Sequence, residues 1–241
     1  MLTLISTGLG DEQGMSLRAF EAAKACDVLY AEQYTTLLAP LERFERLLGR
    51  PVQALERVDL EDRSARLVKQ AASKDVGILV GGDALSATTH TALLLECKMA
   101  GVAARVIHGS SILTAIGEAG LSLYKFGETV TVPRWQPGYR PAGFYATVAK
   151  NRKAGLHTLI LLDIGMTVRE AATELLAIEK ARKGRLFRER VVVLSRAGSL
   201  RQAILYDTLA QLADREDLSP PVALCLPGRL NAFEQEFLDT L

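Results

Sequence analysis

Short apolar runs that alternate with helical patterns constrain the fold of this chain more than any other feature. In the first half, four such runs are rich in Leu, Ile and Val, and each precedes or follows a segment with helical spacing: TLISTG, VLYAE, VGILV and ARVIHG. Continuous apolar strands that alternate with helices are typical of a parallel sheet buried on both faces. We therefore expect an α/β fold with a mostly parallel N-terminal sheet.

The helices between these strands have recognisable ends. Ser16 is a suitable N-cap for a helix over 16–27, and Gly49 and Gly101 are suitable C-terminal residues for helices over 40–49 and 88–101. A further helix is expected over 64–73. In the second half the expected strands are 128–133, 157–164, 190–195 and 222–228, and the expected helices are 110–120, 144–155, 169–184 and 231–241. The segment 202–214 fits a helix or a strand.

The change of character near residue 110 predicts two domains. We place an N-terminal α/β domain at 1–109 and a C-terminal α/β domain with a mixed sheet at 110–241, with a ligand cleft between them.

Composition excludes several function classes. A net charge of +1 gives no sign of the basic surface that nucleic-acid binding needs. No apolar run approaches the ~18 residues of a membrane span. Three separated cysteines indicate reduced thiols and a cytoplasmic location. The three histidines lie on different expected elements, so we predict no metal site.

The turn GLGDEQG, residues 8–14, is close to the glycine pattern that binds dinucleotides, and Glu32 ends the next strand. Asp11 and Glu12 argue against that interpretation, because two carboxylates would face the pyrophosphate at a helix N-terminus. A tight strand-to-helix turn, or a ligand without phosphate, fits the residues better.

The turn GGDALSATTH, residues 81–90, suits a cationic or neutral ligand. Gly81 and Gly82 allow close approach of the backbone, and Asp83 places a negative charge after a strand. S-adenosylmethionine, with its sulfonium, carboxylate and adenosine, is a ligand of this kind. The alternative is that Asp83 and Ser86 only cap the following helix, and the same alternative applies to the serines of HGSSIL.

Four segments together resemble a known family: GDALSATTH, HGSSILTAIGEAGLSLYKFGETVTVP, GLHTLILLDI and LPGRL. The chain resembles the diphthine synthases, a branch of the tetrapyrrole-methylase-like S-adenosylmethionine methyltransferases. The resemblance extends over nearly the whole chain. It implies two α/β domains, a cofactor in the cleft between them and a homodimer.

The resemblance also implies the reaction and the site. The reaction is successive methylation of the amino group of a 3-amino-3-carboxypropyl-modified histidine on elongation factor 2. The positions that match the family's cofactor site are Leu9, Asp83, Ser86, Ser111, Ile112, Leu162, Tyr206 and Asn231. Three positions depart from the family. Ala84 occupies a position where the family usually has proline, Tyr206 one where relatives have a small residue, and Asn231 one where many have histidine.

Methyl transfer from a sulfonium needs alignment and partial desolvation of the amine, so we name no catalytic residue. The loop 134–143, with Trp135 and Tyr139, is a candidate lid for the protein substrate, or an ordinary surface loop. Three alternative functions remain open at this point. They are a tetrapyrrole methyltransferase of cobalamin or sirohaem synthesis, a nicotinamide-dependent reductase, and a binding protein that has lost catalysis, which only the three departures from the family suggest.

Overall fold

The computed structural model describes residues 1–34 and 39–241. The chain divides into two compact units, an N-terminal unit of Met1–Ile112 and a C-terminal unit of Leu113–Leu241. Whether the expected division at 109 and 110 separates independently folding domains stays a prediction. Among the described residues, no helix has the length and apolar character needed to cross a membrane.

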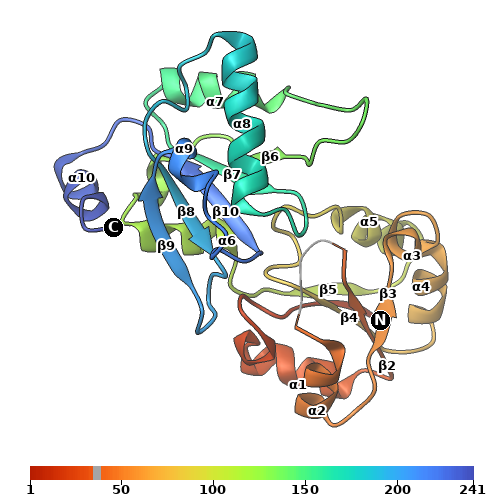
Figure 1. Cartoon of the computed structure of the whole chain (residues 1–241). Helices are drawn as coiled ribbons and strands as arrows, with labels where there is room; N and C mark the ends of the chain where they lie inside the picture. The colour runs from red at the N-terminus through yellow and green to blue at the C-terminus, as the bar shows by residue number, and fades with distance from the viewer. Residues whose placement is uncertain (35–38) are drawn as a thin grey trace. The chain divides into compact units, whose positions relative to one another are not determined.

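The N-terminal unit contains a five-stranded sheet with the order β3-β2-β4-β1-β5, and every pair is parallel (Figure 1). Its strands are β1 (Leu2–Ser6), β2 (Val28–Glu32), β3 (Gln53–Leu55), β4 (Val76–Val80) and β5 (Ala104–Ile107). In the centre, Ile5 of β1 lies opposite Leu79 of β4 and Ile107 of β5. All five residues of β1 and of β4 are buried, as expected for central strands covered on both faces.

Helices cover both faces of this sheet. On one face, α1 (Leu17–Ala25) and α2 (Leu41–Leu48) pack with Ile5, Leu29 and Leu79. On the other face, α3 (Arg57–Glu61), α4 (Ser64–Ala71) and α5 (Thr91–Met99) pack with Leu4 and Ile78. The connections that follow different strands therefore lie on opposite faces of the sheet. The point where this direction changes determines where a ligand site forms.

The C-terminal unit contains a mixed sheet with the order β6-β7-β10-β8-β9. Its strands are β6 (Val130–Val132), β7 (Thr158–Leu162), β8 (Val191–Ser195), β9 (Ala203–Asp207) and β10 (Val222–Leu226). Only β6 and β7 pair in parallel, whereas β10 runs antiparallel to both of its neighbours and β9 runs antiparallel to β8.

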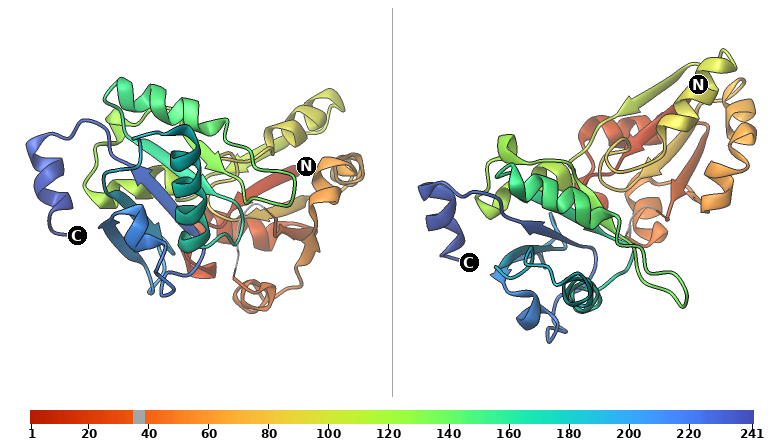
Figure 2. Two further views of the ribbon diagram at one scale, coloured as in Figure 1. Left: turned by 45° about the horizontal axis from the view of Figure 1, so that its top comes forward. Right: turned by 90° about the horizontal axis from the view of Figure 1, so that it is seen from above.

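Three helices cover one face of this second sheet: α7 (Phe144–Lys153), α8 (Val168–Arg182) and α9 (Leu209–Leu212). The long α8 crosses the sheet in Figure 1 and is seen end-on in the right-hand view of Figure 2. In the described residues, the remaining helices are α6 (Ile112–Ala115), α10 (Ala232–Leu238) and three 3₁₀ helices, η1 (Glu12–Gly14), η2 (Ile116–Ala119) and η3 (Leu123–Lys125).

Most expected elements are present, with informative differences. Ser16 caps α1 by accepting a hydrogen bond from Ala19 N, and Gly49 ends α2 in the left-handed conformation. The ambiguous segment 202–214 divides into β9 and the short helix α9. The helix expected over 88–101 begins only at Thr91, and the helix expected over 110–120 is a short α6 followed by η2. β3 and α3 were not anticipated, because both are too short to show a clear period.

Candidate functional site

The carboxyl ends of β1, β4 and β5 form the candidate site in the N-terminal unit. β1 lies between β4 and β5, and the three strands are parallel, so their carboxyl ends meet at one edge of the sheet. The chain leaves β1 toward α1 on one face and leaves β4 toward α5 on the other face. Such a reversal between adjacent strands is the place where open α/β sheets bind ligands.

Glycines allow the three turns to touch. Gly8 and Gly82 exchange two backbone hydrogen bonds, of 3.0 Å from Gly8 N and 2.9 Å from Gly82 N. Both residues have positive φ, 75° and 67°, which glycine adopts without strain. A Cβ on Gly109 would lie 3.0 Å from Gly82 O and 3.1 Å from Gly8 N. The turns after β1, β4 and β5 are therefore brought together.

Asp83 is the central polar group of this cluster. The residue is 8% exposed. One carboxylate oxygen accepts hydrogen bonds from Leu85 N at 2.9 Å and Ser86 Oγ at 3.4 Å. The other accepts from His108 Nδ1 at 2.8 Å and Gly109 N at 3.2 Å. Asp83 thus ties the turn after β4 to the turn after β5.

The ionisation of Asp83 follows from these contacts. Burial raises the pKa of the carboxyl, but the hydrogen bonds from Leu85 N, His108 and Gly109 N outweigh it, and the pKa lies below its ordinary value. Asp83 therefore supplies a fixed negative charge. Because α5 begins at Thr91 and has no side-chain cap, the alternative that Asp83 and Ser86 cap this helix is wrong.

The other expected residues of this unit lie on the same turns. Leu9 follows Gly8, and its N–H donates to Ser110 Oγ at 2.9 Å. Ser111 is buried, and Ile112 begins α6. The sequence interpretation missed two polar residues at strand ends: Ser6, the last residue of β1, whose Oγ accepts from Ala84 N at 2.9 Å, and His108, the residue after β5.

The acidic residues of the first turn have a structural partner. Arg43 lies 2.9 Å from an oxygen of Asp11 and 2.8 Å from one of Glu12. An ion pair at this turn explains the two carboxylates without a ligand. It agrees with the sequence argument against pyrophosphate binding in this turn.

Leu162 and Tyr206, in the C-terminal unit, point to opposite faces of the sheet. Tyr206 shares a register row with Val192, Cys225 and Leu159, so their side chains lie on one face. Leu162 is three residues beyond Leu159 and therefore faces the helix-covered side, where it packs against the core.

Burial raises the pKa of Tyr206, and the Arg190 guanidinium lies 5.6 Å from the centre of its ring. The bulk of this side chain is thus held over the sheet by packing and a cation–π contact. Tyr206 therefore places a packed aromatic ring where the family usually has a small residue.

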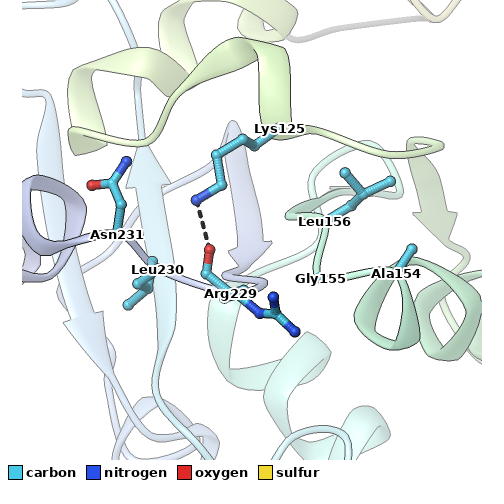
Figure 3. A pocket seen from close by; sticks show the side chains of 7 residues that line it. All are labelled: Lys125, Ala154, Gly155, Leu156, Arg229, Leu230 and Asn231. Carbon is cyan, nitrogen blue, oxygen red and sulfur yellow. Dashed lines mark hydrogen bonds between the residues drawn. The ribbon is translucent and has the colours of Figure 1, made fainter.

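Asn231 is the N-cap of α10. Its side chain accepts from Glu234 N at 2.9 Å, while Glu234 Oε2 accepts from Asn231 N at 2.9 Å. The two residues form a reciprocal capping box. Asn231 also lines a hollow of about 350 Å³ together with Lys125, Ala154, Gly155, Leu156, Arg229 and Leu230 (Figure 3). Asn231 is therefore a helix cap, and because it also lines a hollow, its ligand role stays a proposal.

A buried ionic cluster lies under this hollow. Glu234 is 1% exposed and also accepts from Ser122 N and His157 Nε2, each at 3.1 Å, and from Lys125 Nζ. Burial raises its pKa, but these partners together bring the pKa down to about 2. His157 is fully buried and accepts from Gly228 N at 2.8 Å, and burial lowers its pKa. This cluster ties α10 to η3 and to His157, the residue before β7.

The candidate lid, loop 134–143, is held at its base. Trp135 N donates to Glu174 Oε1 at 2.9 Å, and the Arg140 guanidinium lies 5.1 Å from the Trp135 ring. Gln136 and Tyr139 form an isolated bridge at its tip, and Tyr139 is exposed. These contacts describe an ordered loop, and its role as a lid stays a prediction.

The residues at the N-terminal cluster fit a cationic ligand such as S-adenosylmethionine better than a phosphate. A Cβ on Gly82 would meet nothing closer than Ser110 O at 3.9 Å, so the backbone there is open to a ligand. Asp83 adds the negative charge that a sulfonium prefers. In the part of the chain that the structure describes, no group of three His, Cys, Asp or Glu residues is placed to hold a metal ion.

Comparisons with known proteins agree with this architecture. The model of the tetrapyrrole (corrin/porphyrin) methylases matches residues 1–213. The diphthine synthase of Methanocaldococcus jannaschii is 36% identical over 100% of this chain and 98% of its own length. That of Methanothermobacter thermautotrophicus is 39% identical over 99% of this chain and 94% of its own.

A solved structure gives the same result. A crystal structure of diphthine synthase superposes with a TM-score of 0.91 at 36% identity, covering 99% of this chain and 94% of the other. With this coverage the likeness extends to both units and to their order along the chain. The chain therefore belongs to the tetrapyrrole methylase family of methyltransferases and, within it, to the diphthine synthases.

Proposed function

We propose that this chain methylates the amino group of the 3-amino-3-carboxypropyl-histidine intermediate on elongation factor 2, using S-adenosylmethionine. The diphthine synthases to which it belongs act in diphthamide biosynthesis. The observation that supports the proposal best is the meeting of Gly8, Gly82 and Gly109 around the charged Asp83 at the reversal point of the first sheet.

The proposed cofactor residues have different tasks. All four hydrogen-bonding directions of the Asp83 carboxylate are used within the protein, so Asp83 acts through its charge and by fixing the turns. The backbone around Gly82 provides the surface that a ligand approaches. Leu9, Ser86, Ser111 and Ile112 complete this part of the proposed site, while Leu162, Tyr206 and Asn231 are its proposed part in the C-terminal unit.

S-adenosylmethionine supplies a methyl group already activated by its sulfonium. The nitrogen of the neutral amine forms a bond to the methyl carbon as the carbon–sulfur bond breaks, and the amine proton leaves to water or a carboxylate. The protein's task is therefore to align the amine and to remove water from it. A fixed negative charge at Asp83 stabilises the sulfonium in the ground state, so its main contribution is to binding.

The proposal includes the partner, assembly and location. The protein substrate is elongation factor 2, the active form is a homodimer, and the reaction takes place in the cytoplasm, where elongation factor 2 works. Light scattering of the purified protein measures the assembly directly, and a mass equal to one chain would contradict the dimer.

The decisive test is a transfer assay with methyl-labelled S-adenosylmethionine and elongation factor 2 that carries the unmethylated intermediate. Label on the modified histidine is the expected result. The intermediate has both an amine and a carboxylate, so the labelled product is then treated with mild alkali. Label on nitrogen survives this treatment, whereas a methyl ester loses it.

Two controls, one for methyl transfer and one for ligand binding, test the alternative functions. A tetrapyrrole of the cobalamin or sirohaem route is expected to receive no label, although the family model includes enzymes that act on such molecules. Calorimetry is expected to show binding of S-adenosylhomocysteine and none of NADH. Transfer to the tetrapyrrole without transfer to elongation factor 2 would overturn the proposal.

A further inference from the structure

Arg196 has a backbone conformation that its residue type does not favour. It directly follows β8 and has a φ of 52°, in the left-handed region. Lys183 shares this conformation, with a φ of 50°, but it is the C-cap of α8, where left-handed residues commonly end helices. Arg196 lies at the end of a strand, where no such rule applies.

The surrounding turn fixes this conformation. Arg196 N donates to Pro221 O at 2.8 Å, and Arg196 O accepts from Ser199 N at 3.0 Å. Gly198 N donates to Gln202 Oε1 at 2.6 Å, which closes the turn from the other side. Glycine would satisfy all of these bonds without strain, so the backbone does not explain an arginine here.

The side chain of Arg196 lacks the partners that comparable arginines have. Arg50, Arg134 and Arg196 each have a buried Nε without a hydrogen-bond partner. The Arg50 Nη atoms bind backbone carbonyls, among them that of Lys24 at 3.0 Å, and Arg134 Nη2 lies 3.3 Å from Glu170. Arg196 is a half-buried residue, and its guanidinium has no ion-pair partner in the part of the chain that the structure describes.

Arg196 lies at the same edge of the sheet as Leu162. Ser195 pairs with Val222, and Leu161 pairs with the next residue of β10, Ala223, so Ser195 and Leu162 flank Val222. Two strand spacings separate them by about 10 Å.

Further unpartnered polar atoms lie beside this edge. β6 runs parallel to β7, and the residues that follow it, Arg134 and Trp135, include a buried Nε and a buried Nε1 without partners. Glu174, which binds Trp135 N, has an unpartnered buried Oε2. Buried polar groups are normally paired, so such a concentration indicates a place where a polar ligand completes the bonding.

We propose that Arg196 binds the carboxylate of an amino-acid group in the methyl-transfer reaction. This inference rests on the proposed function, in which two molecules carry such a carboxylate: the 3-amino-3-carboxypropyl group of the substrate and the methionyl part of the cofactor. The planar guanidinium forms two parallel hydrogen bonds to a carboxylate, which orients the neighbouring amine or sulfonium.

The test uses Arg196→Gly, Arg196→Lys and the control Lys183→Gly. Glycine removes the guanidinium and also the left-handed strain, so both glycine variants are expected to melt at or above the wild-type temperature. Calorimetry measures the affinity of each protein for S-adenosylhomocysteine. A second titration measures the affinity of its S-adenosylhomocysteine complex for elongation factor 2 that carries the unmethylated intermediate.

A fall of at least tenfold in one affinity is expected for Arg196→Gly, with a smaller fall for Arg196→Lys and none for Lys183→Gly. Loss in the first titration assigns the carboxylate to the cofactor, and loss in the second alone assigns it to the substrate. Affinities within twofold of wild type in both titrations would overturn the inference while leaving the proposed function standing. A large fall in melting temperature for Arg196→Gly would overturn it in favour of a structural role, and wild-type protein that binds neither ligand would overturn both proposals.

Discussion

Gly8 and Gly82 face each other across the carboxyl ends of β1 and β4 and are joined by two backbone hydrogen bonds, of 3.0 and 2.9 Å. This pair holds together two turns that then diverge to opposite faces of the sheet. Although the two glycines are symmetric in their hydrogen bonding, their surroundings differ. A Cβ on Gly8 would lie 2.3 Å from Gly14 O, whereas one on Gly82 would meet nothing closer than 3.9 Å.

We therefore expect Gly8→Ala and Gly82→Ala to differ in stability. Gly82→Ala introduces only the cost of a left-handed alanine, about 1 kcal/mol of unfolding free energy. Gly8→Ala adds a backbone overlap and is expected to lose about 3 kcal/mol in total. Urea denaturation measures both values, and equal losses would contradict this description of the turn.

Asp83→Asn tests the link between the turns after β4 and β5. The amide has one oxygen in place of two, so some of the donors Leu85 N, Ser86 Oγ, His108 Nδ1 and Gly109 N lose their acceptor. We expect a loss of about 1–3 kcal/mol in unfolding free energy, together with weaker binding of S-adenosylmethionine, whose sulfonium charge S-adenosylhomocysteine lacks.

The matched control for this variant is Asp217→Asn, which alters an exposed pair with Arg215. Exposed pairs contribute little, so this control is expected to change the unfolding free energy by less than about 0.5 kcal/mol. Calorimetry then decides the ligand role of Asp83. Unchanged cofactor affinity in Asp83→Asn would restrict Asp83 to a structural role.

The Glu234 cluster predicts a loss of stability in acid. The pKa of Glu234 falls from 4.5 to about 2 on folding. Its contribution to the free energy of unfolding is therefore fully present above pH 4.5 and disappears as pH falls toward 2. The pKa of His157 is also lowered, so its contribution is present above pH 6.5 and declines as pH falls below that value. For Glu234 the pKa shift corresponds to about 3 kcal/mol of unfolding free energy at neutral pH.

Glu234→Gln should remove most of the pH dependence between pH 5 and pH 2 and destabilise the protein at pH 7. An amide cannot accept from all four donors, and it leaves Lys125 without its counter-charge. Glu236→Gln, on the exposed side of the same helix, is the control and should behave as wild type. Identical acid unfolding curves for the two variants would disprove the assignment to Glu234.

Asn231 combines a cap with a proposed ligand contact, and three substitutions separate these roles. Asn231→Asp keeps a capping oxygen and should keep stability, whereas Asn231→Ala should lose about 1 kcal/mol. Asn231→His restores the residue frequent in the family and is expected to keep S-adenosylhomocysteine affinity. If affinity stays constant across all three variants in calorimetry, Asn231 does not belong to the cofactor site.

The sequence by itself determined the class of fold and most of its elements. Continuous apolar runs such as VGILV formed buried strands. Ser16 caps the start of α1 and Gly49 caps the end of α2, as their chemistry requires. These features are local, because periodicity and capping depend on residues within one or two turns of each other. The sequence also marked the polar turns around Gly8, Asp83 and Ser110 as unusual.

Only the tertiary structure decided what those turns do. The order β4-β1-β5 brings three segments that are distant in sequence to one edge, and it makes Asp83 the acceptor for His108 and Gly109 instead of a helix cap. The register of the second sheet likewise places Leu162 and Tyr206 on opposite faces. Strand order and register arise from packing between distant residues, and no local pattern in the sequence encodes them.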